Sequence, residues 1–539
     1  MGHSKGNFQW LIAIRKNRVE KERRNIMSTS VFILAVIIIY LLFVIFTGIM
    51  IGRKTKQSSE GFFLGGRAMG PLVTAMSAEA SDMSSYLLMG IPGVAYLTGL
   101  ADATWTALGL GIGTYLNFLL VSKRLRRYSA KIDAVTIPGF FSKRFGDKSR
   151  VIETVAALII IIFFIPYVAS GLQAIGKLAT TLFDGSVDPT TGVAGPKVSY
   201  MAGVVIGAIV ILSYSTVGGF GSVAVMDLIQ SIIMTFALVV IVFFAINKAG
   251  GWENAMTYLS GLPGYLKLNE TYDPGTGTAG AYGLITIIST MAWGLGYFGM
   301  PHILVRFMSI RHEDELKTSR RIAAIWVFIS MGVAIVIGII GKAMSNEGVI
   351  ANLSGSDSER VIIHIANLLA HNGVFFAIIA GVILAGILAA TMSTADSQLL
   401  CAASSFSENI MQGTFKKKLD SKQSLFAARC TIIIIVIFAI FIASNPESPI
   451  GKSIFQVVAF AWAGFGACFG PGMLLALFDK RMNKEGIGAG MIAGAIMIFV
   501  WKFMVRPLGG AWNIYELLPA FLVNLVIAII VSKMALRNF

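Results

Sequence analysis

The stretch PLVTAMSAEASDMSSYLLMGIPG, residues 71–93, carries two acids and four serines in a segment that is otherwise apolar and long enough to cross a bilayer. A second stretch, STMAWGLGYFGMPHILVRF (289–307), places three glycines and Pro301 in the middle of an apolar segment. Glycine and proline weaken a helix interior, and unwound backbone at membrane depth is tolerated only where it lines a cavity in the protein. The sequence therefore predicts two broken helices at the centre of the fold.

The composition around these stretches is that of an integral membrane protein. Of 539 residues, 55% are hydrophobic and 13% are charged, and the mean hydropathy is +0.75. A soluble domain carries about 25% charged residues. Apolar runs of about 20 residues recur without strict alternation, which favours an all-α polytopic membrane protein over a β-barrel. Cys401, Cys430 and Cys468 show no CxxC spacing, so we expect neither a disulfide framework nor a zinc site.

Lysine and arginine alternate across the connections between the predicted spans. The loops on one side hold 28 of these residues, those on the other side hold 9, and 7 precede the first span. By the positive-inside rule, the carboxyl terminus is cytoplasmic and the first span starts outside. The loops account for the formal net charge of +16, so we expect no nucleic-acid partner. The thirteen predicted spans lie near 31–51, 71–95, 104–122, 151–176, 199–217, 223–247, 280–304, 322–342, 373–405, 427–444, 453–478, 486–504 and 513–532.

The segment 1–26 conflicts with this topology, because its seven basic residues resist translocation. Either it is absent from the mature protein, which would then start at Met27, or later spans force the orientation of the first. No cleavage site of small residues follows the apolar run, so it is not a secretory signal. We treat 1–26 as a basic extension of doubtful status and 27–539 as one transmembrane domain.

The two interrupted segments are the second and seventh spans, five spans apart. Interrupted helices at matching positions in two halves indicate a transporter site between inverted repeats, here about 70–247 and 280–478. Ordinary glycine-mediated packing is the alternative for either helix alone. Two such helices in register favour the transport interpretation.

Five motifs carry a resemblance to a known family: LGGR (64–67), SAEASDMSSYLLMG (77–90), AWGLGYFGMPH (292–302), AATMSTADSQLL (389–400) and AWAGFGACFGP (461–471). From about residue 31 to its end, the chain resembles the sodium/solute symporter family, in particular its proline-carrying members. The resemblance implies thirteen spans with two five-helix inverted repeats and two broken helices, the amino acid–sodium symporter-like fold. It also implies sodium-coupled import of L-proline by alternating access across the cytoplasmic membrane. Another solute (pantothenate, a monocarboxylate or a sugar) and a channel or sensor without coupled transport remain open.

Three hydroxyl-bearing residues share one face of the ninth span with Ala390, because Ala390, Ser393, Thr394 and Ser397 recur at spacings of three and four. Sodium, a hard cation, prefers such oxygens and backbone carbonyls. The alternative is that each hydroxyl bonds the carbonyl one turn back. The sodium site implied by the resemblance consists of the carbonyls of Ala80, Met83 and Ala390 with the hydroxyls of Ser393 and Thr394.

Acidic side chains also lie within predicted spans, where an ionisable group is costly and indicates function. The resemblance assigns Asp82 to the sodium side, as a direct ligand or as a group that orients the broken helix. Glu79 replaces a small residue of many relatives, and its role stays open. Asp227, Asp396 and Ser397 form a candidate second cation site, with a proton at Asp396 as the alternative.

The resemblance implies a proline pocket lined by Ser84, Ser85, Tyr167, Trp293, Tyr297 and Pro301. Aromatic rings give a flat slot for the pyrrolidine ring and attract its ammonium group. The alternative is that these aromatic residues only pack or lie at the membrane interface. Ser85 and Tyr86 stand where close relatives have glycine and tryptophan, and Met300 replaces a glutamine, which leaves the identity of the solute open.

Several motifs of other protein classes are absent from the sequence. It contains no GxxxxGK[ST], GxSxG or HExxH, so we expect neither ATP-driven pumping nor an enzyme. GLGIG (109–113) lies in a span and is interpreted as helix packing. We expect no cofactor other than the coupling sodium ion, and the expected partners are sodium, a small solute and the lipid bilayer.

Overall fold

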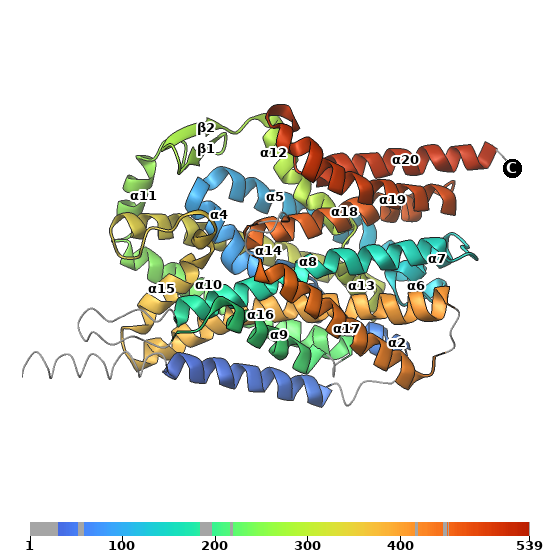
Figure 1. Cartoon of the computed structure of the whole chain (residues 1–539), viewed down its shortest axis with the longest axis horizontal. Helices are drawn as coiled ribbons and strands as arrows, with labels where there is room; N and C mark the ends of the chain where they lie inside the picture. The colour runs from blue at the N-terminus through green and yellow to red at the C-terminus, as the bar shows by residue number, and fades with distance from the viewer. Residues whose placement is uncertain are drawn as a thin grey trace, which may run out of the picture.

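The structure, a computed structural model, describes residues 31–51, 59–183, 197–215, 219–415, 419–445, 450 and 452–537. The predicted extension 1–26 lies outside this part of the chain. Figure 1 shows long helices packed side by side, most of them running along the longest axis of the molecule.

The apolar runs of the sequence fold into helices throughout the described chain. The helix Val31–Ile51 comes first. The others are α2 (Ser59–Leu64), α3 (Pro71–Ser85), α4 (Ile91–Thr98), α5 (Leu100–Asn117), α6 (Lys123–Lys131), α7 (Ile137–Arg144), α8 (Val151–Leu182), α9 (Tyr200–Ser215), α10 (Phe220–Lys248), α11 (Trp252–Ser260), α12 (Leu284–Met291), α13 (Pro301–Ser309), α14 (Leu316–Asn346), α15 (Val361–Ala370), α16 (Val374–Ser404), α17 (Ser421–Ser444), α18 (Ile454–Phe478), α19 (Lys484–Val500) and α20 (Leu517–Arg537).

Each of the thirteen predicted spans corresponds to helix within the described residues. Ten helices there are long and apolar enough to cross a membrane, and α12 with α13 makes an eleventh as a bent pair. The other two predicted spans are α9, of 16 residues, and the broken segment α3–α4. The expected all-α fold is therefore confirmed. An antiparallel hairpin of β1 (Glu270–Asp273) and β2 (Thr278–Ala281), which the sequence analysis did not predict, is the one sheet in the described part of the chain.

Large apolar side chains cover the outside of the bundle. Ile39, Phe243 and Phe441, on three different helices, are 66%, 69% and 76% exposed. A soluble monomer rarely leaves so continuous an apolar surface open to water. The pattern is that of helices facing lipid hydrocarbon.

The two ends of the bundle differ in charge. In Figure 1, α6, α7 and the carboxyl terminus lie at one end, and α11, α15 and the β-hairpin lie at the other. Helix α6 has the sequence KRLRRYSAK, with five basic residues among nine. We call this the basic end, and the other the hairpin end.

The first predicted break lies at Ser84, where α3 ends and a π-turn, Tyr86–Gly90, leads into α4. Ser84 has φ 46° and ψ −166°, a backbone conformation that residues with a Cβ rarely adopt. Its hydroxyl accepts a hydrogen bond from the N–H of Tyr86 at 3.1 Å. Such a local bond gives the backbone an alternative to the helix, which explains why the run of serines interrupts this span.

The second predicted break lies at Gly299 and Met300. Helix α12 passes into a 3-10 segment, Ala292–Phe298, and α13 begins at Pro301 after an extended Met300. Proline lacks an N–H and fits the first turn of a helix, so it starts α13 rather than continuing the preceding segment. The two parts are bent by 45°. Both predicted interruptions are therefore present.

Glycines bring the second broken span against α5. A Cβ on Gly113 would lie 2.4 Å from the carbonyl oxygen of Gly294, and one on Gly294 would lie 2.3 Å from that of Gly109. The two backbones are thus in direct contact, and any side chain here would push them apart. The interpretation of GLGIG as helix packing is confirmed.

Candidate functional site

Four oxygens converge where α16 packs against the broken end of α3. The hydroxyl of Ser393 donates to the carbonyl of Ala80 at 2.7 Å and that of Thr394 does so at 3.4 Å. Both hydroxyls also lie 3.1 Å from the carbonyl oxygen of Ala390, one turn back. The structure therefore combines the cross-helix contact expected of an ion site with the local contact of the alternative interpretation.

The spacing of these oxygens suits a hard cation. Oxygens bound about 2.4 Å from one ion lie about 3.4 Å apart, close to the separations found here. The carbonyl of Met83, the fifth predicted ligand, accepts the backbone N–H of Tyr86 at the break. In the described residues, no three His, Cys, Asp or Glu side chains gather in a way that could hold a metal. An ion at this place would bind to carbonyls and hydroxyls.

Asp82 joins three elements at the centre of the bundle. Its carboxylate accepts a hydrogen bond from the hydroxyl of Tyr297, in the second broken span. Its backbone carbonyl accepts one from the hydroxyl of Tyr167, on α8, at 3.1 Å. Asp82 is 5% exposed, and burying a charge at this depth requires such partners. The predicted sodium and solute residues thus meet at Asp82.

A cavity lies beside Asp82, between the two broken spans. It measures about 10 Å³, roughly the room that one water molecule needs. A solute as large as an amino acid therefore requires the lining side chains to move apart. The lining residues are Asp82, Met83, Tyr86, Leu110, Tyr167, Trp293, Met331, Val458 and Trp462.

Aromatic rings form one wall of this cavity. The ring of Trp293 lies 5.3 Å from that of Tyr86, 5.4 Å from that of Phe455 and 5.1 Å from that of Tyr515. The indole N–H of Trp462 donates to the carbonyl of Trp293 at 2.8 Å, which fixes both residues. The result is a flat, apolar surface next to a carboxylate, suited to a small zwitterion with an apolar body.

The candidate second cation site contains a cation of its own. The guanidinium of Arg306 donates to the carboxylate of Asp227 at 2.8 Å and to the hydroxyl of Ser397 at 2.5 Å. The hydroxyl of Ser77 accepts from Arg306 at 2.7 Å and donates to Asp227 at 2.6 Å. Arg306 is 1% exposed. The predicted seventh span ends at residue 304 and leaves Arg306 in the following loop, so the structure corrects that boundary.

Comparison with known proteins gives the family. The model of the sodium:solute symporter family matches residues 62–494. This chain belongs to the sodium:solute symporter family. It is therefore a multi-pass membrane protein of a transporter family.

Relatives of this symporter-family chain match along nearly its whole length. The osmoregulated proline transporter OpuE of Bacillus subtilis is 37% identical over 500 residues, which are 93% of this chain and 94% of the relative. The sodium/proline symporter of Escherichia coli is 36% identical and that of Staphylococcus aureus is 35% identical; each match covers 92% of both chains.

Solved structures support the fold of the symporter family. A sodium-coupled sialic acid symporter, in a substrate-bound outward-open state, matches with a TM-score of 0.71 at 18% identity and covers 93% of this chain and 98% of its own. A nucleobase-cation-symport-1 family transporter in a closed conformation matches with a TM-score of 0.51 at 13% identity, over 88% of this chain and 93% of its own. These identities are low, so the two structures bear on the fold alone.

Some of the predicted solute residues of this symporter-family chain line the cavity, and others lie beside it. Tyr167 and Trp293 line it, and Tyr297 reaches it through Asp82. Ser84 forms the break, and the hydroxyl of the buried Ser85 has no hydrogen-bond partner. Pro301, also buried, begins α13.

Other site residues were not assigned from the sequence. Leu110, Met331, Val458 and Trp462 line the cavity, but apolar residues inside spans give no signal that separates lining from packing. Among the acids within the spans, Glu79 is 1% exposed, and its Oε2 has no hydrogen-bond partner. One carboxylate oxygen of Asp396 accepts the N–H of Ser397 at 3.1 Å. The role of Glu79 therefore stays open.

Proposed function

We propose that this chain is a sodium-coupled symporter that imports L-proline, and that it is a transporter rather than an enzyme. The observation that carries the proposal is the contact of Ser393 and Thr394 with the carbonyl of Ala80, beside an aromatic cavity. Relatives at 35–37% identity that are named as proline transporters support the choice of solute.

In this proposal sodium joins α3 to α16. The carbonyls of Ala80, Met83 and Ala390 and the two hydroxyls turn toward the ion, so that binding energy holds the broken helix against its neighbour. Asp82, one residue before Met83, keeps Tyr297 in place and orients the break. The sodium-bound arrangement then has the complete solute site, which couples ion and solute binding.

The proline lies in the cavity with its ring against Trp293 and Tyr86. Its carboxylate faces backbone N–H groups at the break, and its ammonium group faces Asp82 or an aromatic ring. Ser85, Tyr86 and Met300, which depart from the family pattern, set how tightly the solute is held.

The proposed topology places the hairpin end outside the cell and the basic end in the cytoplasm, with the transporter in the plasma membrane. The excess of Lys and Arg at α6 supports this orientation. The two repeats, about 70–247 and 280–478, each contain one of the broken spans. A membrane potential of ~100 mV and a tenfold sodium gradient give ~3.7 kcal/mol per sodium ion, about 500-fold accumulation.

The proposal includes one sodium ion per cycle, because Arg306 occupies the candidate second cation site. Its guanidinium already pairs with Asp227 and contacts Ser397, two of the three residues of the candidate second cation site. In this proposal Arg306 supplies that positive charge permanently, and Asp396 is left as the group that takes a proton.

Uptake of labelled proline into proteoliposomes after a sodium jump tests the function. We expect accumulation with sodium and none with choline, and counterflow of unlabelled against labelled proline. Pantothenate, a short monocarboxylate and a sugar are added as competitors. Proline accumulation that is equal with sodium and with choline would overturn the assignment. So would competition by one of these solutes that is stronger than that of unlabelled proline.

A further inference from the structure

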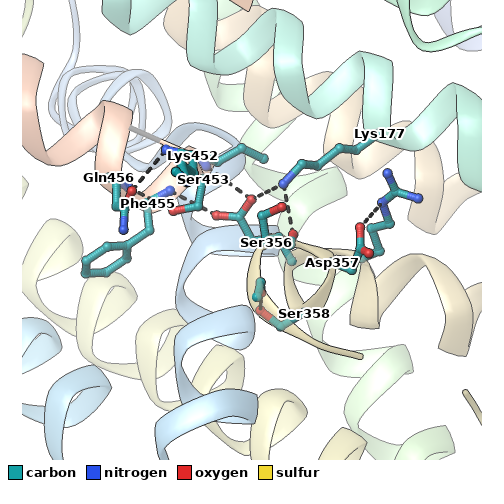
Figure 2. A network of polar contacts seen from close by, with 12 residues as sticks. Lys177, Ser356, Asp357, Ser358, Lys452, Ser453, Phe455 and Gln456 are labelled. Atoms are coloured by element: carbon teal, nitrogen blue, oxygen red, sulfur yellow. Dashed lines mark hydrogen bonds and ion pairs between the residues drawn. The ribbon is translucent and has the colours of Figure 1, made fainter. Parts of the chain in front are cut away.

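A buried ion pair lies at the hairpin end of the bundle, outside the sites described above. The ammonium of Lys177, near the end of α8, lies 2.5 Å from the carboxylate of Glu359 and donates to the carbonyl of Ser356 at 2.9 Å. Glu359 belongs to a 3-10 segment, Gly355–Arg360, just before α15. Figure 2 shows this network, in which Lys177 and Ser356 approach each other from separate elements.

The same carboxylate holds the start of α18. Its two oxygens accept the N–H of Ile454 at 3.1 Å and the N–H of Phe455 at 3.0 Å. The first N–H groups of a helix have no partner within the helix, and an anion there is stabilising. Ser453 caps the third N–H, that of Gln456, so Glu359 completes the first turn.

Both charged side chains of the ion pair are buried, so each needs its hydrogen-bonding partners. Glu359 is 3% exposed and Lys177 is 7% exposed, and such residues are almost never buried unless they are paired. A fourth element closes on them, since a Cβ on Gly93, in α4, would lie 2.9 Å from the Cγ of Glu359. Helices α4, α8 and α18 and the 3-10 segment therefore meet at one carboxylate.

Phe455, whose N–H is held by Glu359, packs on two aromatic residues of the cavity wall. Its ring lies 5.3 Å from that of Tyr86, in a stacked arrangement, and 5.4 Å from that of Trp293. Tyr86 and Trp293 both line the cavity, and so does Val458, one turn further along α18. The position of the Phe455 backbone thus sets where its ring packs on Tyr86 and Trp293.

We propose that Lys177 and Glu359 form an outer latch, and that Glu359 is a positioning residue that holds Phe455 over the bound solute. The inference rests on the proposed function and its topology. When the hairpin end opens, the carboxylate exchanges Lys177 and the two N–H groups for water, and Phe455 withdraws with the first turn of α18. When the bonds re-form, the cavity closes on that side.

Accessibility of a single cysteine tests the latch. Val458→Cys is introduced after replacement of Cys401, Cys430 and Cys468 by alanine, and a membrane-impermeant maleimide is added to intact cells. Glu359→Gln should raise the labelling rate about tenfold, because a neutral amide accepts fewer and weaker hydrogen bonds from Lys177 and α18. Glu347→Gln, the same change at an exposed glutamate near the end of α14, should not change it.

Kinetics in the protein with native cysteines distinguish a latch from a merely structural role. Glu359→Gln should lower the sodium concentration for half-maximal uptake severalfold and lower the maximal rate, since outward-open molecules accumulate. Lys177→Gln should do the same, and Lys177→Arg should restore both values. If Glu359→Gln reduces folding, Lys177→Gln still tests the latch, because in that variant the carboxylate of Glu359 still accepts the N–H groups of α18.

The outcomes separate the two proposals. Labelling that does not change in Glu359→Gln and Lys177→Gln, in proteins that reach the membrane, overturns the latch even if proline uptake is normal. Labelling that rises in both variants supports the latch even if the wild-type chain carries a solute other than proline.

Discussion

The hydroxyl of Tyr297 donates a hydrogen bond to the carboxylate of Asp82, and so joins the two broken spans across 215 residues of sequence. One partner comes from the predicted ion site and the other from the predicted solute site. The bond therefore connects the proposed ion site directly with the proposed solute site.

Removing this hydroxyl should weaken the connection without disturbing the packing of the ring. In Tyr297→Phe, the buried carboxylate loses a partner, which costs about 1.5–3 kcal/mol. We expect the KM for proline to rise about tenfold or more, and sodium to lower that KM less than it does in the wild type. Uptake measured over a matrix of sodium and proline concentrations gives both values. Tyr115→Phe, at a 41% exposed tyrosine of α5, is the control; an unchanged sodium effect in Tyr297→Phe would contradict this role.

Loss of either hydroxyl at the contact of α16 with α3 should raise the sodium requirement. We expect Ser393→Ala and Thr394→Ala to raise the sodium concentration for half-maximal uptake about 10–100-fold, because each removes one ligand of a charged group. Thr391→Ala removes a neighbouring hydroxyl that donates to the carbonyl of Ile387 at 2.9 Å, and it should leave the sodium requirement unchanged. If all three variants showed the same dependence of uptake on sodium concentration, the site assignment would be wrong.

Arg306 should act as a fixed counter-charge. Arg306→Gln leaves the carboxylate of Asp227 buried without its partner, which costs about 3–5 kcal/mol. We expect thermal unfolding of the detergent-purified protein to begin at a lower temperature, and Arg306→Gln with Asp227→Asn to recover part of that loss. Arg321→Gln, at an exposed position of α14, serves as the control. If the double variant is no more stable than Arg306→Gln alone, the pairing is not what stabilises this cluster.

The contact between α5 and the second broken span should not tolerate a methyl group. Gly113→Ala would place a Cβ 2.4 Å from the carbonyl oxygen of Gly294, and we expect a loss of about 1–3 kcal/mol of stability together with slower uptake. Gly332→Ala is the matched change, because no atom lies within 4 Å of its added Cβ. In the middle of α14 it should be neutral or stabilise by about 0.5–1 kcal/mol. Thermal unfolding of the two variants side by side measures the difference.

The breaks in the helices could be predicted because they follow from local chemistry. Serines and acids in one span, and glycines with Pro301 in the other, disfavour a continuous helix whatever surrounds them. The spacing of Ser393 and Thr394 predicts that they share one helix face. It does not predict that this face packs against α3. The resemblance to the family supplied that neighbour.

Contacts between distant segments could not be predicted. Arg306 comes near the end of an apolar run, so its sequence position resembles that of a loop residue. In the fold it contacts α3, α10 and α16, which bury it. Lys177 and Glu359 are 182 residues apart. Lys177 directly follows the fourth predicted span, and Glu359 lies in the connection between the eighth and the ninth. Phe455 and Trp462 are aromatic residues in an apolar helix, the commonest kind of packing residue.

The glycine contact has a consequence for how the molecule moves. The backbones of α5 and the second broken span touch at Gly109, Gly113 and Gly294, so we expect the two segments to move together. The joint between α3 and α16 is different, because hydroxyls can release one carbonyl and take up another. We therefore expect motion through the transport cycle to concentrate at the contact between α3 and α16. A sodium ion bound there would control when these two helices can separate.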